Sequence, residues 1–313
     1  MNVLLCGDFD AAEAAEWHEA LSAAMPEATW LTPTQARERP GTVAAAVVAN
    51  PPPGSLQGLP DLRLIQSLWA GVDRLLADPT LPAGVPIARM VDPAMNAAMA
   101  ETALWATLAL QRDFFTYARQ QRQGQWRQHP QRRADECAVL VLGQGEMGRT
   151  AARALAAAGF AVTGWSRNEG PADAGVQRIH GDAALWQALP RARVLVNLLP
   201  LTAQTAGLLN ARLLAALPRG AGVVNLARGR HLVDADLLSA LADGQVSHAV
   251  LDVFHAEPLP AEHPFWAHEQ VTLLPHVAAQ TDARSAAAVA VANLRALRDG
   301  GAVRHLVDPG RGY

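Results

Sequence analysis

The segment 137–159, CAVLVLGQGEMGRTAARALAAAG, restricts the fold more than any other part of the sequence. It places Gly143, Gly145 and Gly148 in Gly-x-Gly-x-x-Gly spacing between a short apolar run and an alanine-rich, helix-forming stretch. In this setting Gly143 turns the chain, Gly145 lets a pyrophosphate approach the backbone, and Gly148 lets helix and strand pack closely. The pattern therefore predicts a dinucleotide-binding α/β domain; an ordinary glycine turn is the alternative.

The strand after the glycine loop indicates which dinucleotide is bound. It runs through GFAVTGWSRN, residues 159–168, and ends at Ser166 and Arg167, with no carboxylate before Glu169. Arg167 follows Gly148 by 19 residues, where an NAD site usually carries Asp or Glu to bind the ribose 2′-hydroxyl. A guanidinium instead attracts a 2′-phosphate, so we predict NADP(H); use of NAD(H), or a solvent-exposed charge without a ligand, is the alternative.

Apolar runs without polar alternation recur along the chain and indicate the fold class. Val- and Leu-rich runs of this type are typical of strands buried on both faces in a parallel sheet. They alternate with helix-like segments, which predicts an α/β, doubly wound architecture. From residue 95 onward we expect strands and helices in these places: a long helix over 95–123, strands at 137–143, 160–166, 192–200, 221–229, 248–254 and 271–276, and a last helix over 282–301.

All 26 basic residues are arginine, and this composition excludes several enzyme classes. Without lysine the chain cannot form a Schiff base with pyridoxal phosphate, complete a Walker A loop, or supply the Tyr-x-x-x-Lys pair of short-chain dehydrogenases. The net charge of −3 gives no general attraction to nucleic acid. The first residues show neither a secretory signal nor a membrane span, so we expect a cytoplasmic protein without a membrane partner.

Three predicted strands of the second half are each followed by a polar residue: Arg228 in NLARGR, Glu257 in DVFHAEPLP and His276 in LLPHVAA. The carboxyl ends of parallel strands gather over the ligand crevice, so these residues can converge. Their types suit reduction of a 2-keto acid. Arg228 can hold a carboxylate and polarise a carbonyl, His276 can donate a proton, and Glu257 can stabilise the imidazolium. For His276 an ordinary loop histidine is the alternative.

In this order, the glycine loop, NLARG, LDVF-x-x-EPLP and PHVAA resemble the D-isomer-specific 2-hydroxyacid dehydrogenase family. The segments WSR, LLPLTAQTAGLLN and the terminal RGY are similar to its bacterial glyoxylate/hydroxypyruvate reductase branch. The resemblance covers essentially the whole chain. It implies an NADP-dependent enzyme that reduces glyoxylate, hydroxypyruvate or a similar short 2-keto acid, with Arg228, Glu257 and His276 as the catalytic set.

The family fold implies two Rossmann-like, doubly wound parallel-sheet domains with a cleft between them. The substrate-binding domain would be discontinuous and flavodoxin-like, formed by 1–100 plus 284–313. The NADP-binding Rossmann domain would comprise 101–283. Closure of the cleft would exclude water and bring hydride donor and acceptor together. The resemblance further implies a homodimer joined largely through the cofactor domains.

The resemblance also implies roles for residues outside the catalytic set. The LWAGVD loop matches the family's substrate loop, so backbone N–H groups of Ala70 and Gly71 would bind the substrate carboxylate, beside Trp69 and Arg228. Asp252 would lie near the nicotinamide carboxamide. The full set of implied cofactor contacts is Gly143, Gly145, Glu146, Met147, Gly148, Ser166, Arg167, Leu199, Pro200, Thr205, Ala227, Arg228, Asp252 and His276.

Two positions depart from that branch. Its members tend to have a small residue where this chain has Trp69, and a Trp in the loop where it has Ala49, Asn50 and Pro51. Trp69 either fills the same pocket from another direction or packs beneath the loop. The preferred 2-keto acid therefore stays open.

Other functions fit parts of the pattern. A co-repressor-like sensor would bind the dinucleotide with little turnover, and a dehydrogenase of a larger D-2-hydroxy acid, such as phosphoglycerate, would need more basic residues near the substrate loop. Enzymes of the L-lactate or malate type carry the glycine loop near the start of the chain, whereas 142 residues precede it here. No metal is expected, because intervening prolines and irregular spacing disfavour a site formed by His255, Glu257, Glu262, His263 and His268.

Overall fold

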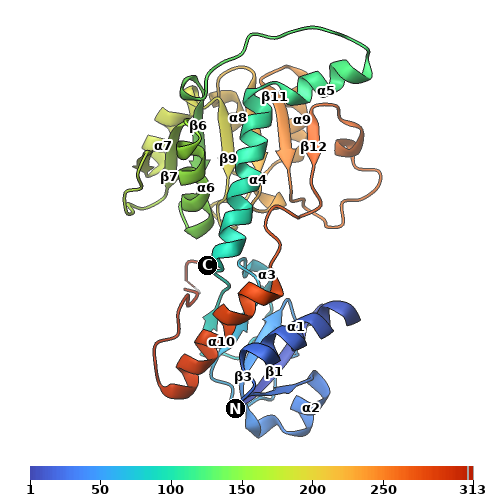
Figure 1. Cartoon of the computed structure of the whole chain (residues 1–313), viewed down its shortest axis with the longest axis vertical. Helices are drawn as coiled ribbons and strands as arrows, with labels where there is room; N and C mark the ends of the chain where they lie inside the picture. The colour runs from blue at the N-terminus through green and yellow to red at the C-terminus, as the bar shows by residue number, and fades with distance from the viewer. Residues whose placement is uncertain (309, 313) are drawn as a thin grey trace. The chain divides into compact units, whose positions relative to one another are not determined.

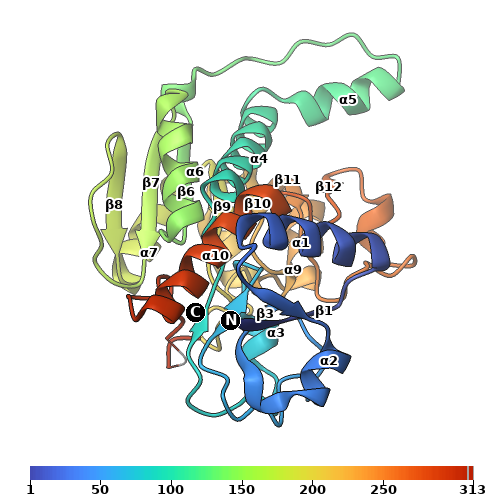
Figure 2. The same cartoon turned by 60° about the horizontal axis from the view of Figure 1, so that its bottom comes forward.

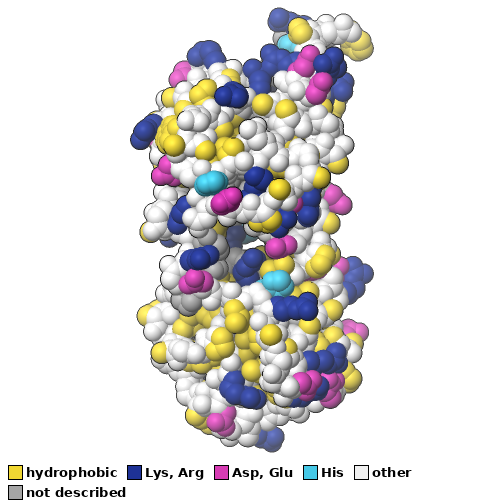
Figure 3. All heavy atoms as spheres, turned by 90° about the vertical axis from the view of Figure 1, so that its left-hand side faces the viewer, with side chains coloured by type: hydrophobic (Ala, Val, Ile, Leu, Met, Phe, Trp, Pro, Cys, Tyr) yellow, Lys and Arg dark blue, Asp and Glu magenta, His cyan; other side chains and the backbone are white. Residues whose placement is uncertain are grey.

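The computed structural model describes residues 1–308 and 310–312. Tyr313, the last residue of the RGY motif, lies outside this part of the chain. No helix within the described residues is both long and apolar enough to cross a membrane. On the face drawn in Figure 3, arginine and acidic side chains are interspersed over the surface, in keeping with the nearly balanced charge of the sequence.

The chain forms two compact units, of which unit 1 comprises Met1–Ala94 and the C-terminal segment from Thr281. Its sheet has five parallel strands in the order β2-β1-β3-β4-β5. Helices from opposite ends of the chain, α1 and α10, pack against each other (Figure 2). The elements of this unit are β1 (Asn2–Gly7), α1 (Ala11–Ala24), β2 (Thr29–Leu31), α2 (Pro33–Glu38), β3 (Val43–Ala49), β4 (Ile65–Ser67), α3 (Asp73–Leu76), β5 (Ile87–Ala88) and α10 (Ala283–Asp299).

Unit 2, Met95–Gln280, is built on seven parallel strands in the order β12-β11-β10-β9-β6-β7-β8. Both units are therefore parallel sheets with helices, which confirms the predicted α/β class (Figure 1). The elements of this unit, including the start of its first helix, are α4 (Pro93–Gln111), α5 (Phe114–Arg122), β6 (Ala138–Leu142), α6 (Glu146–Ala157), β7 (Ala161–Ser166), β8 (Val176–His180), α7 (Asp182–Ala188), β9 (Val194–Asn197), α8 (Ala211–Ala216), β10 (Ala221–Asn225), α9 (Asp234–Ala242), β11 (Val246–Leu251) and β12 (Val271–Leu273).

Apolar side chains cover both faces of the sheet of unit 2. On one face Val139 and Val141 of β6 belong to a buried cluster with residues of α4 and α6. On the other, Leu140 and Leu142 belong to a cluster with residues of α7, α8 and α9. Figure 1 shows α4 and α6 side by side in front of the sheet. Burial on both faces explains why these strands read as unbroken apolar runs in the sequence.

The predicted helix over 95–123 is wrong in its length. Helix α4 ends at Gln111 and α5 begins at Phe114, because Asp113 between them has a φ of 58°. This left-handed conformation interrupts a helix, and Asp adopts it more readily than most residues. Since no proline or glycine marks the break, the apolar pattern alone did not reveal it. Figures 1 and 2 show α5 and the loop after it extending away from the sheet.

From β6 onward several strands are shorter than predicted, and one, β8, was not predicted. Strand β9 ends at Asn197, β10 at Asn225, β11 at Leu251 and β12 at Leu273. The polar residues that follow these strands therefore lie in turns, beyond the ladder. Strand β8 was missed because it lies at a sheet edge and its sequence, VQRIH, lacks the apolar run of a central strand.

Candidate active site

Polar residues follow three neighbouring strands of unit 2. Strands β10, β11 and β12 pair in parallel, with Val224 beside Val250 and Val250 beside Thr272. Parallel neighbours end at the same edge of a sheet. The turns after these strands carry, in chain order, Arg228, then Asp252 and Glu257, then His276. The structure thus brings the predicted trio and Asp252 to one edge.

His276 and Glu257 form a hydrogen-bonded pair. Nδ1 of His276 donates to Oε2 of Glu257 at 2.7 Å, while Oε1 of Glu257 accepts from the Phe254 N–H at 2.8 Å. The hydrogen bond to Glu257 raises the pKa of His276, against burial and the charge of Arg228. Burial alone would raise the pKa of Glu257, but its two hydrogen bonds and nearby positive charges lower it overall. The pair therefore favours a charged imidazolium beside a carboxylate.

Asp252 fixes the backbone that carries His276. Its carboxylate accepts hydrogen bonds from the N–H groups of Val277 at 2.7 Å and Ala278 at 3.1 Å, and its carbonyl oxygen accepts one from the His276 N–H at 2.9 Å. His276 has a φ of 54°, in the left-handed region that few residues other than glycine adopt. These three hydrogen bonds hold His276 in that conformation. Such backbone strain is most often found at functional sites.

The turn that carries Arg228 is held from both sides. Nδ2 of Asn225 donates to the Arg228 carbonyl oxygen at 3.0 Å, and Nδ1 of the fully buried His231 lies 3.2 Å from the same oxygen. Gly229 lies against the backbone of Phe254, where a Cβ would come within 1.9 Å of the carbonyl carbon. A glycine is therefore required for the turn after β10 to approach the loop that carries Glu257.

The glycine loop has the geometry that a bound pyrophosphate needs. Gly143 has a φ of 92°, and a Cβ there would lie 2.5 Å from the Leu198 carbonyl oxygen. A Cβ on Gly148 would lie 1.9 Å from the Gly143 carbonyl oxygen, so helix α6 packs directly on the loop. Gly145 caps the N-terminus of α6, and nothing lies within 4 Å of a Cβ built there. Of the three glycines of the loop, Gly145 alone has open space around its Cα, at the N-terminus of α6. A helix N-terminus attracts a phosphate group, so these residues fit the pyrophosphate of a dinucleotide.

Replacing Gly145 with Ala should weaken dinucleotide binding without unfolding the protein. The added methyl group meets no protein atom within 4 Å and would occupy the open space expected to receive the pyrophosphate. We expect the Kd for NADP⁺ to rise at least ~10-fold, with an unchanged melting temperature, measured by calorimetric titration and thermal unfolding. In contrast, Gly148→Ala should destabilise the fold by about 1–3 kcal/mol. Normal affinity in Gly145→Ala would contradict the assignment.

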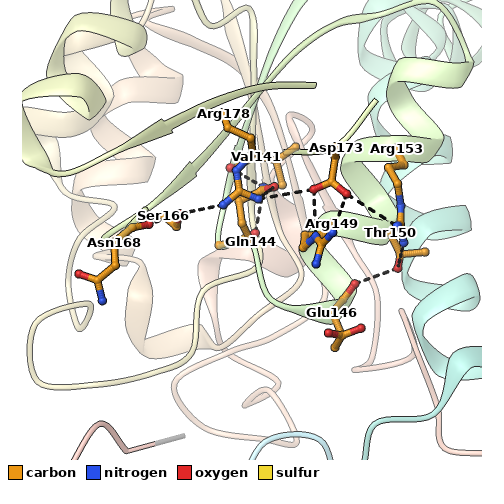
Figure 4. Close-up of polar contacts among 11 residues, drawn as sticks. Val141, Gln144, Glu146, Arg149, Thr150, Arg153, Ser166, Asn168, Asp173 and Arg178 are labelled. Carbon is orange, nitrogen blue, oxygen red and sulfur yellow. Dashed lines mark hydrogen bonds and ion pairs between the residues drawn. The ribbon is translucent and has the colours of Figure 1, made fainter. Parts of the chain in front are cut away.

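The end of β7 carries the predicted ribose-binding residues, and Figure 4 shows how Ser166 is held there. Its Oγ donates to the Asn168 carbonyl oxygen at 2.8 Å and accepts from Nη2 of Arg178 at 3.1 Å. Arg167 is exposed. Arg178 was not predicted as a site residue because it lies on the missed edge strand β8. Arg178 could have been found only from the strand pairing, because β8 lies next to β7 and His180 is beside Ser166.

The remaining predicted cofactor contacts lie around the same strand ends. Glu146 and Met147 open helix α6, and Leu199 and Pro200 follow β9. The Pro200 carbonyl oxygen accepts from Oγ1 of Thr205 at 2.8 Å and lies 3.2 Å from Nε2 of His231. The Ala227 N–H donates to Oδ1 of Asn225 at 3.3 Å. Hydrogen bonds between loops therefore order these segments, while contact of these residues with a cofactor stays a prediction.

The predicted substrate loop, Trp69–Gly71, belongs to unit 1 and follows β4. The Trp69 N–H donates to Oγ of Ser67 at 3.0 Å. The Trp69 ring packs edge-on against Trp17 of α1, with ring centroids 6.3 Å apart. Among the described residues, the N–H groups of Ala70 and Gly71 have no hydrogen-bond acceptor.

The histidines after β11 do not form a metal cluster with their neighbours. Across residues 1–308 and 310–312, no group of three or more His, Cys, Asp or Glu side chains could hold a metal ion. Instead, Nε2 of His255 and of His263 face the carboxylate of Asp234 at 3.7 and 3.4 Å. These contacts tie the loop after β11 to the start of α9.

Known proteins similar to this chain share its full length. The glyoxylate/hydroxypyruvate reductase A of Serratia proteamaculans (strain 568) is 41% identical over 318 residues, which cover 100% of both chains. The protein of the same name from Yersinia enterocolitica is 38% identical over the same length and coverage. The family model described as "D-isomer specific 2-hydroxyacid dehydrogenase, NAD binding domain" matches residues 104–278.

Solved structures agree with these matches. A D-isomer specific 2-hydroxyacid dehydrogenase from Xanthobacter autotrophicus Py2, in complex with NADPH and MES, is 41% identical with a TM-score of 0.93, covering 100% of this chain and 99% of that one. An NADPH-dependent glyoxylate/hydroxypyruvate reductase from Sinorhizobium meliloti, in complex with NADP and sulfate, is 35% identical with a TM-score of 0.92 and the same coverage. Their cofactors agree with the NADP(H) predicted from Ser166 and Arg167. This chain belongs to the D-isomer-specific 2-hydroxyacid dehydrogenase family.

Proposed function

We propose that this protein uses NADPH to reduce glyoxylate, hydroxypyruvate or a similar short 2-keto acid to the 2-hydroxy acid. The observation that carries the proposal is the pair of His276 and Glu257 with Nδ1 and Oε2 2.7 Å apart, which leaves Nε2 of His276 to deliver a proton. Full-length relatives named as glyoxylate/hydroxypyruvate reductases support this class of substrate.

In the proposed mechanism each residue of the trio has a defined role. NADPH, when bound, supplies a hydride to the carbonyl carbon of the substrate. His276 gives its Nε2 proton to the carbonyl oxygen, so the products are the hydroxy acid and neutral histidine. Glu257 stabilises the imidazolium before transfer and orients the ring through Nδ1. Arg228 binds the substrate carboxylate and polarises the carbonyl with paired hydrogen bonds. The histidine regains its proton from solvent, to which half of its side chain is exposed.

The loop Trp69–Gly71 is the proposed substrate-recognition segment. The N–H groups of Ala70 and Gly71 have no protein acceptor within the described chain, and so suit a carboxylate. Because Trp69 packs on Trp17, its ring is held in place and limits the substituent that a 2-keto acid can carry. Residues 1–100 plus 284–313 form the proposed substrate-binding domain, and residues 101–283 the proposed NADP-binding domain.

A panel assay tests this function. Purified protein is mixed with NADPH or NADH and with glyoxylate, hydroxypyruvate, pyruvate and phosphohydroxypyruvate, and nicotinamide absorbance is followed. We expect turnover of the small acids with NADPH, and a lower kcat/KM with NADH. Binding of NADPH without turnover of any acid would support a co-repressor-like sensor instead. Turnover confined to phosphohydroxypyruvate would indicate a dehydrogenase of a larger D-2-hydroxy acid.

We also propose a homodimer that associates through unit 2. Large apolar side chains are exposed on α4, α5 and the loop after them: Trp105 is 43% exposed, Phe114 55% and Trp126 97%. Trp105 also lines a groove of about 340 Å³, together with Glu101, Thr102, Leu274, Val277 and Ala278. Exposed apolar surface of this kind is typical of subunit contacts.

The dimer can be checked by sedimentation. The species should have about twice the chain mass of 33.2 kDa, since C₂ dimers are the commonest oligomers. Trp126→Ser together with Phe114→Ser should shift it toward monomer, whereas the exposed Trp266→Ser on the loop before β12 serves as the matched control. A monomer at all concentrations would contradict the proposal.

A further inference from the structure

Arg178 of β8 joins two segments of the cofactor region (Figure 4). Its Nη1 donates to Oε1 of Gln144 in the glycine loop at 3.1 Å, and its Nη2 donates to Oγ of Ser166 at the end of β7, also at 3.1 Å. The Arg178 side chain is only 12% exposed. Because a guanidinium is planar and rigid, it holds the two acceptors in a fixed spatial relation.

Hydrogen bonds orient the amide of Gln144 toward Arg178. Its Nε2 donates to the carbonyl oxygens of Val141 at 3.3 Å and Gly143 at 3.1 Å, which leaves Oε1 to accept from Arg178. The amide lies over Gly164 of β7, where a Cβ would come within 2.5 Å of Oε1. Because Gly164 has no side chain, the Gln144 amide can lie over it and connect the glycine loop to Arg178.

Asp173 lies next to Arg178 and also contacts Arg149 and Arg153. Its carboxylate forms two hydrogen bonds with Arg149, both at 2.9 Å, and lies 3.6 Å from Arg178 and 3.7 Å from Arg153. The side chain is only 3% exposed, and the hydrogen bond from Arg149 lowers its pKa. One ionised carboxylate thus faces three guanidinium groups. Nε of Arg178 is buried without a hydrogen-bond partner among the described residues, and a surplus of positive charge remains beside Ser166.

We propose that Arg178 is a positioning residue that selects NADP(H) by fixing Ser166 for the ribose 2′-phosphate. Because Oγ of Ser166 accepts from Arg178, its single hydrogen points away from the guanidinium. That hydrogen is donated to Asn168 here and would be donated to a phosphate oxygen in the complex. The surplus positive charge favours a phosphate over the 2′-hydroxyl of NAD(H). The inference rests on the proposed use of NADP(H).

Calorimetric titration with NADP⁺ and with NAD⁺ tests this role, using Arg178→Gln. Gln cannot reach both Gln144 and Ser166. We expect the Kd for NADP⁺ to rise about tenfold, because Ser166 serves only the 2′-phosphate. The Kd for NAD⁺ should change less than about twofold, since Gln144 in the glycine loop keeps its hydrogen bonds to Val141 and Gly143. A purely structural role would weaken both cofactors alike. Arg178→Lys, which keeps the charge, should restore part of the preference; no restoration would contradict the electrostatic part of the proposal.

Two further variants separate positioning from net charge. Arg153→Gln removes the same charge from the same cluster without contact to Ser166. Because Arg153 is half exposed, this variant should lower the NADP⁺ preference much less than Arg178→Gln does. In a Ser166→Ala background, Arg178→Gln should change the ratio less than in the wild type, because coupled residues are not additive.

Each alternative outcome has a distinct meaning. An equal effect of Arg153→Gln and Arg178→Gln, or full additivity with Ser166→Ala, would overturn the positioning role. So would an unaltered preference in Arg178→Gln when the wild type prefers NADP⁺. A wild-type protein that binds NAD⁺ as tightly as NADP⁺ would instead contradict the proposed cofactor itself.

Discussion

Replacing His276 with Gln should lower kcat for reduction of a 2-keto acid by about 10²- to 10⁴-fold. Gln retains a polar side chain of similar reach but cannot give a proton to the carbonyl oxygen as the hydride arrives. Since Nδ1 of His276 is bound to Glu257, the lost function is that of Nε2. Affinity for NADP⁺ should fall far less than turnover. Steady-state kinetics and calorimetric titration of the same preparation measure the two effects.

The matched control is His18→Gln, a histidine exposed on α1 of unit 1. This variant should keep the kcat of the wild type. If H276Q also retained that kcat, His276 would have no place in the mechanism. A fall in NADP⁺ affinity as large as the fall in turnover would point instead to a role in cofactor binding.

Replacing Glu257 with Gln should move the pH dependence of kcat. Glu257 raises the pKa of His276, and reduction requires the protonated ring, so the wild-type rate falls as pH rises through that raised pKa. Without the carboxylate, the pKa of His276 should fall toward or below its ordinary value of about 6.5. The decline in kcat should then begin at lower pH, with an alkaline rate about tenfold lower for each unit of pKa lost.

A pH profile of kcat in the direction of reduction, from about pH 5 to 9, measures this shift across the range in which histidine titrates. Glu262→Gln changes an exposed acid in the same loop and should leave the profile in place. A Glu257→Gln profile that falls at the same pH as the wild type would show that another group controls the protonation of His276.

Much of the site could be predicted because its chemistry lies next to strong local patterns. Gly143, Gly145 and Gly148 directly follow a buried strand, and Arg228, Glu257 and His276 follow three others. Parallel strands bring such ends together whatever the details of the loops. The convergence of the trio therefore depends on sheet topology, which apolar runs report well.

The parts that were missed depend on contacts that no local pattern contains. Arg178 lies on an edge strand whose polar sequence VQRIH resembles a loop, and its role depends on Ser166 and Gln144, 12 and 34 residues away. The break between α4 and α5 depends on a single backbone angle at Asp113. Likewise, the need for a glycine at position 229 depends on its contact with the backbone of Phe254, which is 25 residues away in the sequence.

The anchoring of His276 through Asp252 has a consequence for the energetics of catalysis. Three successive amide groups, from His276 to Ala278, donate to this one residue, which directly follows β11. The proposed proton donor is therefore held by backbone hydrogen bonds to the end of β11, and little of its motion needs to be frozen when the transition state forms. Without the hydrogen bonds to Asp252, the backbone of His276 would be mobile. The entropy of activation for reduction would then become less favourable.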